Sequence, residues 1–521
     1  MPAPESLPCK YCLVRMTAVD RACLEPLLFC RYPYSEWGSF FFFGYRITPW
    51  GLHVTFVKAL EPMVGDFDEK SHIVEFNPRY ILRAQLAFES SSLGIGFIHS
   101  HPEDCGTSAS VLDDDMDSYL SRTFGESAEG RPYVTLRVAR DSAGRFSFDG
   151  EAWLGAEVMP VKTLLTTGAE LKRESATLDG AARPSRGESP EVRSRYAKLI
   201  GAKVGKLSEA RVAIAGCSGL GSPVAHVLVR AGVRKFVLVD PEFFAPSNLE
   251  RMHGSTWSDN EALPTKVEIL ARLIHDIEPT AEVEMIRSNI LHEDVLDRLL
   301  RCDLVLGCTD SQHSRAALGD FASHYLLPCI DAAVLMRAKE GKLTEQVGDI
   351  ARYSPDEPCP WCLARIDPKI LAYELMTPEE RKLRSDAAVD AVRRGVDGAQ
   401  YWGDAPPSEL TVGYMTTTVG AMQAGYAQAW LTGTGSQPHQ RFQFDLGMPF
   451  LGAVAVEKRR APECSCNRTK GLADQARCDR SVTLPPHWQP PSLEPQFTKL
   501  PECFVRVITL RNANPQRDFI R

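Results

Sequence analysis

The sequence predicts an α/β protein in which a mixed α/β domain is followed by a doubly wound, mostly parallel Rossmann-like domain. Three observations predict this fold class. Short β-type runs dominate the first part, strand and helix patterns alternate strictly in the second, and a stretch rich in charge, Gly, Ser and Pro separates them. We expect a first domain at 1–165, a linker at 166–194, a second domain at 195–480 and a Pro-rich tail at 481–521.

The first domain is predicted to combine strands with two helices. Apolar runs and apolar–polar alternation predict the strands, and two stretches with helical periodicity lie between them. The expected strands are 52–60, 94–101, 133–140 and 146–154, and the expected helices are 78–91 and 110–124.

The second domain is predicted as a series of βαβ units. The expected strands are 211–216, 235–240, 283–288 and 303–308, and the expected helices are 222–232, 265–277, 292–301, 377–394 and 416–431. Strand and helix alternating at this spacing is typical of a parallel sheet with helices on both faces.

Composition and charge narrow the class of protein. Of 521 residues, 44% are hydrophobic and 24% charged, as in ordinary globular proteins. The 59 basic and 67 acidic residues give a net charge of −8, which argues against a protein that coats nucleic acid or an anionic membrane. Because the apolar runs are too short to cross a bilayer and no leader pattern is visible, we expect a cytoplasmic protein without nucleic-acid or membrane partners.

A glycine-rich turn is the strongest local signal in the second domain. Gly216, Gly219 and Gly221 follow a buried strand and open a helix whose N-terminal N–H groups can hold phosphate. The next strand ends in Asp240, which is placed to accept hydrogen bonds from ribose hydroxyls. These residues alone are equally compatible with the NAD-binding half of a dehydrogenase.

Three further motifs favour ATP over NAD. The segments FFAPSNLERM, PTKVE and GCTDSQHSR follow in order at strand ends or helix starts. With the glycine turn, they resemble the adenylating domain of the ThiF/MoeB and ubiquitin-activating enzyme superfamily over about 195–466. The resemblance implies that Asp240 binds the ribose of ATP, Asn248 and Arg251 bind its phosphates, Lys266 binds the β- and γ-phosphates, and Asp310 binds Mg²⁺. Such cations neutralise a pyrophosphate leaving group while a carboxylate attacks the α-phosphorus.

The segment RYAKLIG resembles the superfamily's RYxRQ, whose arginine reaches the ATP of the partner subunit. Arg195 takes this place, which implies a homodimer. The segment departs from the pattern in having Lys198 and no Gln, and a solvated basic helix start is the alternative.

The fifteen cysteines are too sparse for a disulfide-stapled domain. Two close pairs, Cys359 with Cys362 and Cys464 with Cys466, predict a closed structural Zn²⁺ site, as the superfamily often carries; the alternative is that one of these thiols is reactive. Ubiquitin-activating relatives usually place a thioester-forming cysteine between such pairs, but none lies there in this sequence. Either the enzyme stops at the adenylate, or Cys478 or Cys503 takes this part.

A second metal pattern lies in the first domain. His99 and His101 are two residues apart on a strand and so point to the same side, while Ser110 and Asp113 share one face of the next helix. Two imidazoles and a carboxylate leave the fourth position of a catalytic Zn²⁺ to water. This pattern of residues resembles the JAB/JAMM (MPN) metallo-isopeptidase motif. The resemblance implies that Glu36 is the general base and that Ser110 helps to hold the oxyanion of the tetrahedral intermediate. One extra residue precedes Ser110, and the alternative is a docking platform that has lost its metal.

Both resemblances imply a ubiquitin-like protein with a C-terminal glycine as partner. The fold class is then a JAMM-like domain followed by a Rossmann-like adenylation domain, similar to activating enzymes of bacterial ubiquitin-like conjugation systems, some of which belong to antiviral defence operons. ATP, Mg²⁺ and Zn²⁺ are the expected cofactors, and a conjugating enzyme is a further possible partner. The alternatives are a sulfur-carrier adenylyltransferase, an activating enzyme with an inert JAMM-like scaffold and, more distantly, a dehydrogenase.

Overall fold

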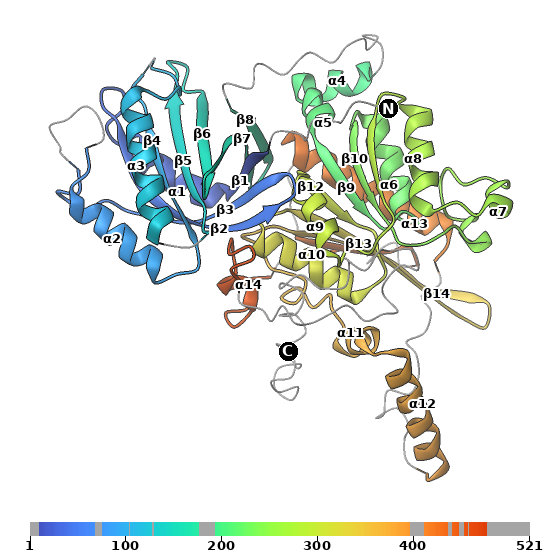
Figure 1. Cartoon of the computed structure of the whole chain (residues 1–521). Helices are drawn as coiled ribbons and strands as arrows, with labels where there is room; N and C mark the ends of the chain where they lie inside the picture. Colours follow the sequence, from blue (N-terminus) through green and yellow to red (C-terminus); the bar gives the residue numbers. More distant parts are fainter. Residues whose placement is uncertain are drawn as a thin grey trace, which may run out of the picture. The chain divides into compact units, whose positions relative to one another are not determined.

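In a computed structural model, the chain divides into two compact units, each held together by contacts among its own residues (Figure 1). Unit 1 comprises Met1–Glu188, His324–Leu326 and Thr469–Ala476, and unit 2 comprises Ser189–Ser323, Leu327–Arg468 and Arg477–Arg521. The structure describes residues 10–67, 75–103, 105–127, 130–176, 193–395, 411–435, 440–447, 453–456 and 458–476.

An eight-stranded sheet in the order β1-β3-β2-β4-β5-β6-β7-β8 frames unit 1. Its strands are β1 (Tyr11–Thr17), β2 (Trp37–Thr48), β3 (Gly51–Leu60), β4 (Gly94–Ser100), β5 (Tyr133–Arg140), β6 (Phe146–Leu154), β7 (Glu157–Thr167) and β8 (Leu171–Ser175). β1 pairs in parallel with both β3 and β7, so the sheet closes on itself and β8 alone is added outside the ring.

Two apolar clusters lie on opposite faces of this sheet. Successive strand residues point to opposite faces, so Phe41 and Phe43 enter one cluster while Phe40 and Phe42 enter the other. Helix α1 (Ala18–Leu28) packs on the first cluster, and α2 (Pro78–Glu89) and α3 (Val111–Ser127) pack on the second. The FFFF run therefore serves two cores at once.

Two short segments from later in the chain complete unit 1, namely His324–Leu326 and Thr469–Ala476. In the second segment, Ala473 forms a parallel bridge with Tyr45 of β2. The second domain expected from the sequence, at 195–480, includes both segments, whereas their contacts group them with unit 1.

The sheet of unit 2 also has eight strands, in the order β11-β10-β9-β12-β13-β14-β15-β16. The strands are β9 (Arg211–Ala215), β10 (Lys235–Val239), β11 (Glu282–Ile286), β12 (Leu304–Gly307), β13 (Cys329–Lys339), β14 (Lys342–Tyr353), β15 (Arg441–Asp445) and β16 (Ala453–Val456). β9 to β13 pair in parallel, and β14 to β16 extend the sheet in antiparallel fashion. The chain runs from β9 outward to β10 and β11 and then returns to β12 and β13 on the other side of β9, which is a doubly wound order.

The helices of unit 2 follow the strands closely. They are α4 (Ser194–Ile200), α5 (Gly205–Glu209), α6 (Gly221–Ala231), α7 (Asp259–Ala262), α8 (Lys266–Ile277), α9 (Glu293–Leu299), α10 (Gln312–His324), α11 (Pro368–Leu375), α12 (Pro378–Arg393), α13 (Gly413–Thr432) and α14 (Ser465–Arg468), with 3₁₀ turns η2 (Gly201–Val204) and η3 (Pro246–Asn248). Local signals set their ends: a capping box between Thr265 and Glu268 starts α8, and Gly232, with φ of +119°, ends α6.

The α/β class predicted from the sequence is confirmed, and the predicted helices and strands all have counterparts. Within the predicted linker, however, β7 runs to Thr167 and β8 covers Leu171–Ser175. An edge strand with one exposed face carries charged residues, and this composition mimics a linker. The predicted tail, which contains Cys503, lies outside the described residues, and so does Cys478 at the end of the predicted second domain. Among the residues that the structure describes, no helix has the length and apolarity needed to cross a bilayer.

Candidate functional site

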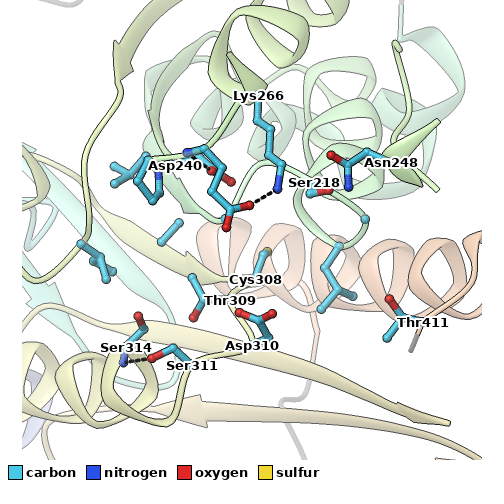
Figure 2. A pocket seen from close by; sticks show the side chains of 18 of the residues that line it. Ser218, Asp240, Asn248, Lys266, Cys308, Thr309, Asp310, Ser311, Ser314 and Thr411 are labelled. Carbon is cyan, nitrogen blue, oxygen red and sulfur yellow. Dashed lines mark hydrogen bonds and ion pairs between the residues drawn. The ribbon is translucent and has the colours of Figure 1, made fainter. Parts of the chain in front are cut away.

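A cavity of about 700 Å³ opens at the carboxyl ends of the parallel strands of unit 2 (Figure 2). Residues that follow β9, β10 and β12 line it. From β9 the chain proceeds to β10 on one side, whereas β12 and β13 lie on the other, so the cavity occupies the switch point of the sheet. In open α/β sheets, ligands bind at this place.

Glycine is required at two of the three predicted turn positions. Gly216 has φ of +93°, and a Cβ on it would lie 2.5 Å from the carbonyl oxygen of Cys308. A Cβ on Gly221 would lie 1.9 Å from the carbonyl oxygen of Gly216. Gly219 lines the cavity and has more room, since the nearest atom to its Cβ would be a side-chain carbon of Arg251 at 3.2 Å. The tight turn brings the N-terminal end of α6 to the cavity.

Asp240 lies directly after β10 and is buried. Its carboxylate accepts hydrogen bonds from the backbone N–H groups of Cys217 (2.7 Å) and Glu242 (2.9 Å). Burial raises its pKa, an effect that the nearby Lys266 opposes. The carboxylate is thus fixed at the cavity wall, where a ribose hydroxyl could donate to it.

Lys266 is the first residue of α8, and its side chain enters the cavity (Figure 2). The ammonium group is mostly buried and forms an ion pair with the carboxylate of Glu242. A phosphate bound here would compete with Glu242 for the ammonium group. Sequence reasoning missed Glu242, although it stands only two residues after Asp240.

Asn248 and Arg251 line the cavity from the segment around η3. The Asn248 side-chain oxygen accepts a hydrogen bond from the backbone of Ala245 (2.9 Å), which orients the amide group. The Arg251 guanidinium donates to the carbonyl oxygen of Thr411 at 3.2 Å. Both side chains are therefore held at the cavity by the chain's own backbone.

Asp310 stands just beyond β12 and lines the cavity with an exposed carboxylate, the kind of ligand that Mg²⁺ prefers. Arg315, which sequence reasoning missed, also lines the cavity, and its guanidinium Nε donates to the fully buried Asp331 (2.8 Å). Its place on α10, five residues after Asp310, was the available signal. Arg195 is exposed on α4 and is not among the residues lining this cavity.

The four predicted cysteine ligands come together in unit 2. The Sγ atoms lie 3.5 Å apart for Cys359 and Cys464, 3.8 Å for Cys359 and Cys362, and 3.9 Å for Cys362 and Cys466. Disulfide bonds are about 2.05 Å long, whereas tetrahedral Zn–S bonds of about 2.3 Å put sulfur atoms about 3.8 Å apart. Hydrogen bonds from the neighbouring thiols lower the pKa of Cys362. The donor set fits Zn²⁺.

In unit 1, His99, His101 and Asp113 also come together. The Nε2 atoms of the two histidines are 3.1 Å apart, and the Asp113 carboxylate lies 3.1 Å from His99 Nε2 and 3.7 Å from His101 Nε2. Burial lowers the pKa of His101 and so favours the neutral imidazole that a metal requires. Its Nδ1 lies 2.9 Å from the carbonyl oxygen of Gly106, which leaves Nε2 for a metal. These residues fit Zn²⁺ with an open position.

Ser110 caps helix α3 beside this cluster. Its backbone N–H donates to the Asp113 carboxylate (2.7 Å), and its Oγ accepts from the Asp113 N–H (3.2 Å). This reciprocal capping box by itself accounts for the SxxD spacing. Glu36 immediately precedes β2, where Trp37 pairs with Ser100 of β4, so the backbone of the predicted base runs beside the strand that carries the histidines.

A buried arginine that sequence reasoning missed braces the loop and helix of this cluster. Arg137 on β5 donates to the carbonyl oxygen of Thr107 (3.3 Å) and to Asp117 of α3 (3.1 Å), and forms an ion pair with Asp149 (3.5 Å). Burial raises the pKa of Asp117 to about 6. The arginine thereby joins the loop before Ser110 to the helix that carries the candidate ligand.

The parallel sheet, the glycine turn and the cavity at the switch point define a nucleotide-binding α/β domain of the doubly wound class. The family model described as "ThiF family" matches residues 193–466, more than half of the chain. The chain therefore belongs to the ThiF family.

Curated relatives match parts of this region. The SAMP-activating enzyme E1 of Haloferax volcanii is 28% identical over 159 residues, covering 30% of this chain and 55% of that protein. The ubiquitin-like modifier-activating enzyme 5 of Drosophila erecta is 29% identical over 26% of this chain and 37% of its own. The adenylyltransferase and sulfurtransferase UBA4 of Eremothecium gossypii is 28% identical over 43% and 49%. The chain thus spans about half or less of the length of these relatives.

Among solved structures, the crystal structure of E. coli MccB with ATP aligns with 54% of this chain and 76% of that chain. The two share 17% sequence identity with a TM-score of 0.40.

Proposed function

We propose that the chain activates the C-terminal glycine of a ubiquitin-like protein by ATP-dependent adenylation. The observation that supports this best is the switch-point cavity, which gathers Lys266, Arg251 and Asp310 beside the glycine turn. Two basic side chains and one carboxylate suit a nucleoside triphosphate with Mg²⁺, whereas an NAD-dependent dehydrogenase has no use for the two cations here. Family membership and relatives named as activating enzymes favour the same activity.

In this reaction the substrate carboxylate bonds to the α-phosphorus of ATP, and pyrophosphate leaves with the electrons of the broken P–O bond. Asp240 orients the ribose, and Asn248 and Arg251 hold the phosphates. Lys266 exchanges its contact with Glu242 for the β- and γ-phosphates. Mg²⁺, held by Asp310, would neutralise charge on the pyrophosphate.

The Asp310→Ala variant tests this proposal by ATP–pyrophosphate exchange stimulated by the cognate ubiquitin-like protein. We expect exchange to fall at least about a hundredfold, because an electrostatic contact at the leaving group is lost. Asp386→Ala, at an exposed position of α12, is the matched control and should exchange like wild type. An unchanged rate in Asp310→Ala would contradict the proposal.

Electrophoresis without reductant, applied to the same reactions, separates two fates of the adenylate. No cysteine stands between Cys362 and Cys464, which favours the sulfur-carrier alternative, in which the adenylate is released to a sulfur donor. A reductant-sensitive adduct would instead require a thioester outside the usual place, on Cys478 or Cys503, and a conjugating enzyme as the next partner.

Arg195 is proposed to reach the nucleotide of a second copy in a homodimer.

For unit 1 we propose a JAMM-type zinc hydrolase that cleaves the bond after the same glycine. The convergence of His99, His101 and Asp113 supports this activity. Glu36 takes a proton from the attacking water, and Ser110 stabilises the oxyanion of the tetrahedral intermediate. Trimming a precursor in this way exposes the carboxylate that adenylation needs. An inert scaffold that recruits the ubiquitin-like protein is the alternative.

A further inference from the structure

A carboxylate from α11 caps the helix that begins beside Asp310. The first backbone N–H groups of α10 have no partner within the helix. The Oε1 atom of Glu374 accepts a hydrogen bond from the N–H of Gln312 (2.9 Å). Its Oε2 atom accepts from the N–H of His313 (2.9 Å) and from the hydroxyl of Ser311 (2.9 Å). Both oxygens therefore accept hydrogen bonds from donors of a single turn.

This cap acts on the turn that carries Asp310. Ser311 directly follows Asp310 in the chain, and the Ser311 Oγ also accepts a hydrogen bond from the N–H of Ser314 (3.2 Å; Figure 2). A second tie comes from the same part of the chain, since the N–H of Asp367 donates to the side-chain oxygen of Gln312 (3.1 Å). The backbone on which the exposed Asp310 carboxylate stands is thus held from outside its own βα unit.

Apolar packing keeps α11 in position to make this contact. Ala316 of α10 forms a cluster with Ile366 and Leu371, against which Trp361 and Leu375 also pack. The partly buried Glu374 carboxylate loses hydration, which raises its pKa, and three donors together with the positive end of α10 oppose this effect. The apolar contacts of α11 and the hydrogen bonds of Glu374 therefore hold α11 against α10 together.

We propose that Glu374 is a positioning residue of the nucleotide site: by fixing the Ser311 turn, it holds Asp310 where the cavity binds Mg²⁺ together with ATP. The inference rests on the proposed function only in taking ATP as the ligand. Because Glu374 fills the N-terminal end of α10, this helix end offers no competing phosphate site, and the phosphates are left to Lys266 and Arg251. The segment after the first cysteine pair thereby controls metal binding without touching the nucleotide.

Calorimetric titration of ATP into the full chain at a series of Mg²⁺ concentrations tests this role. In Glu374→Ala we expect the Mg²⁺ concentration for half-maximal ATP binding to rise about fivefold or more, because the turn no longer holds Asp310 in place; a fivefold rise corresponds to about 1 kcal/mol, the size of a typical helix-cap contribution to stability. ATP affinity without Mg²⁺ should stay unchanged, a split that a merely structural role would not produce. Glu374→Gln, which keeps one acceptor oxygen, should show a smaller rise, and the exposed Glu379→Gln on α12 should match wild type.

Ser311→Ala provides a second variant in case Glu374→Ala does not fold. It leaves the two N–H bonds to Glu374 and removes the two bonds of the hydroxyl, to Glu374 and from the N–H of Ser314, so the Mg²⁺ requirement should shift in the same direction. A folded Glu374→Ala whose Mg²⁺ requirement equals that of wild type would overturn the inference. A wild-type chain that binds ATP with Mg²⁺ but does not exchange pyrophosphate would contradict the proposed function and leave this role intact.

Discussion

Single substitutions separate the two candidate metal clusters, because each is built from its own side chains. We expect two zinc ions per wild-type chain, measured by elemental analysis of the purified protein. Cys359→Ser should lose one of them, since a tetrahedral thiolate site lacks a ligand without this sulfur. Asp113→Asn should lose the other, because the carboxylate supplies the charge that complements two neutral imidazoles.

The control for this measurement is Cys23→Ser, a substitution of an exposed cysteine on α1 that belongs to neither cluster. It should keep the wild-type zinc content. If wild type carries a single zinc ion and Cys359→Ser removes it, unit 1 holds no metal and the scaffold alternative gains support.

Sequence patterns reveal residues whose partners are fixed by short spacing. The pairs around Cys359 and Cys464, and the His99–His101 pair, are visible in this way, and the structure brings each set together. The roles of Glu374 and Arg137 were not predicted from the sequence, because their partners lie many residues away and only packing brings them close. A lone glutamate on an amphipathic helix carries no signal that it caps another helix.

At the scale of the elements, the turn between β9 and α6 depends on glycine in a position-specific way. Gly216→Ala would force a left-handed φ on a side chain and drive its Cβ against the Cys308 carbonyl oxygen. We expect the free energy of unfolding to fall by more than about 1 kcal/mol and ATP binding to weaken. Denaturant unfolding and calorimetry measure the two effects.

Gly219→Ala is the matched substitution within the same turn. Its φ is not in the left-handed region, and its Cβ would meet only side-chain carbons of Arg251 and Thr416, at 3.2 and 3.3 Å. Because side chains can shift where a backbone carbonyl cannot, stability should change much less than in Gly216→Ala. Equal losses would show that the turn needs glycine for another reason than backbone conformation.

Strands made of continuous apolar runs were predictable, whereas β8 and β14 were not. The parallel strands β9, β10 and β12 are continuous apolar runs, as expected for strands buried on both faces. The strand β8 and the antiparallel β14 carry exposed charged residues, so their sequences resemble loops. Pairing with a neighbouring strand, which no local pattern encodes, decides their structure.

At the scale of the molecule, unit 1 is completed by residues from the far end of the chain. The side chain of Asp474 pairs with Arg46 of β2 at 3.0 Å, and the hydroxyl of Tyr325 donates to the same carboxylate at 2.6 Å. Gly471 accepts a hydrogen bond from the Thr55 hydroxyl (2.7 Å) through its carbonyl oxygen. The order of residues along the chain therefore does not match the division into units, which sequence boundaries alone cannot reveal.

A chain ending at Arg468 should accordingly destabilise unit 1 although the deletion lies outside its first 188 residues. Removing Asp474 breaks its mostly buried ion pair with Arg46, which costs about 3 kcal/mol or more. Hydrogen–deuterium exchange should show faster exchange in β2 and β3. A chain ending at Ala476 keeps every contact of the segment and should exchange like the full chain. If β2 and β3 exchange equally slowly in both truncated chains, unit 1 folds without this segment, and the contacts of 469–476 do not stabilise the sheet.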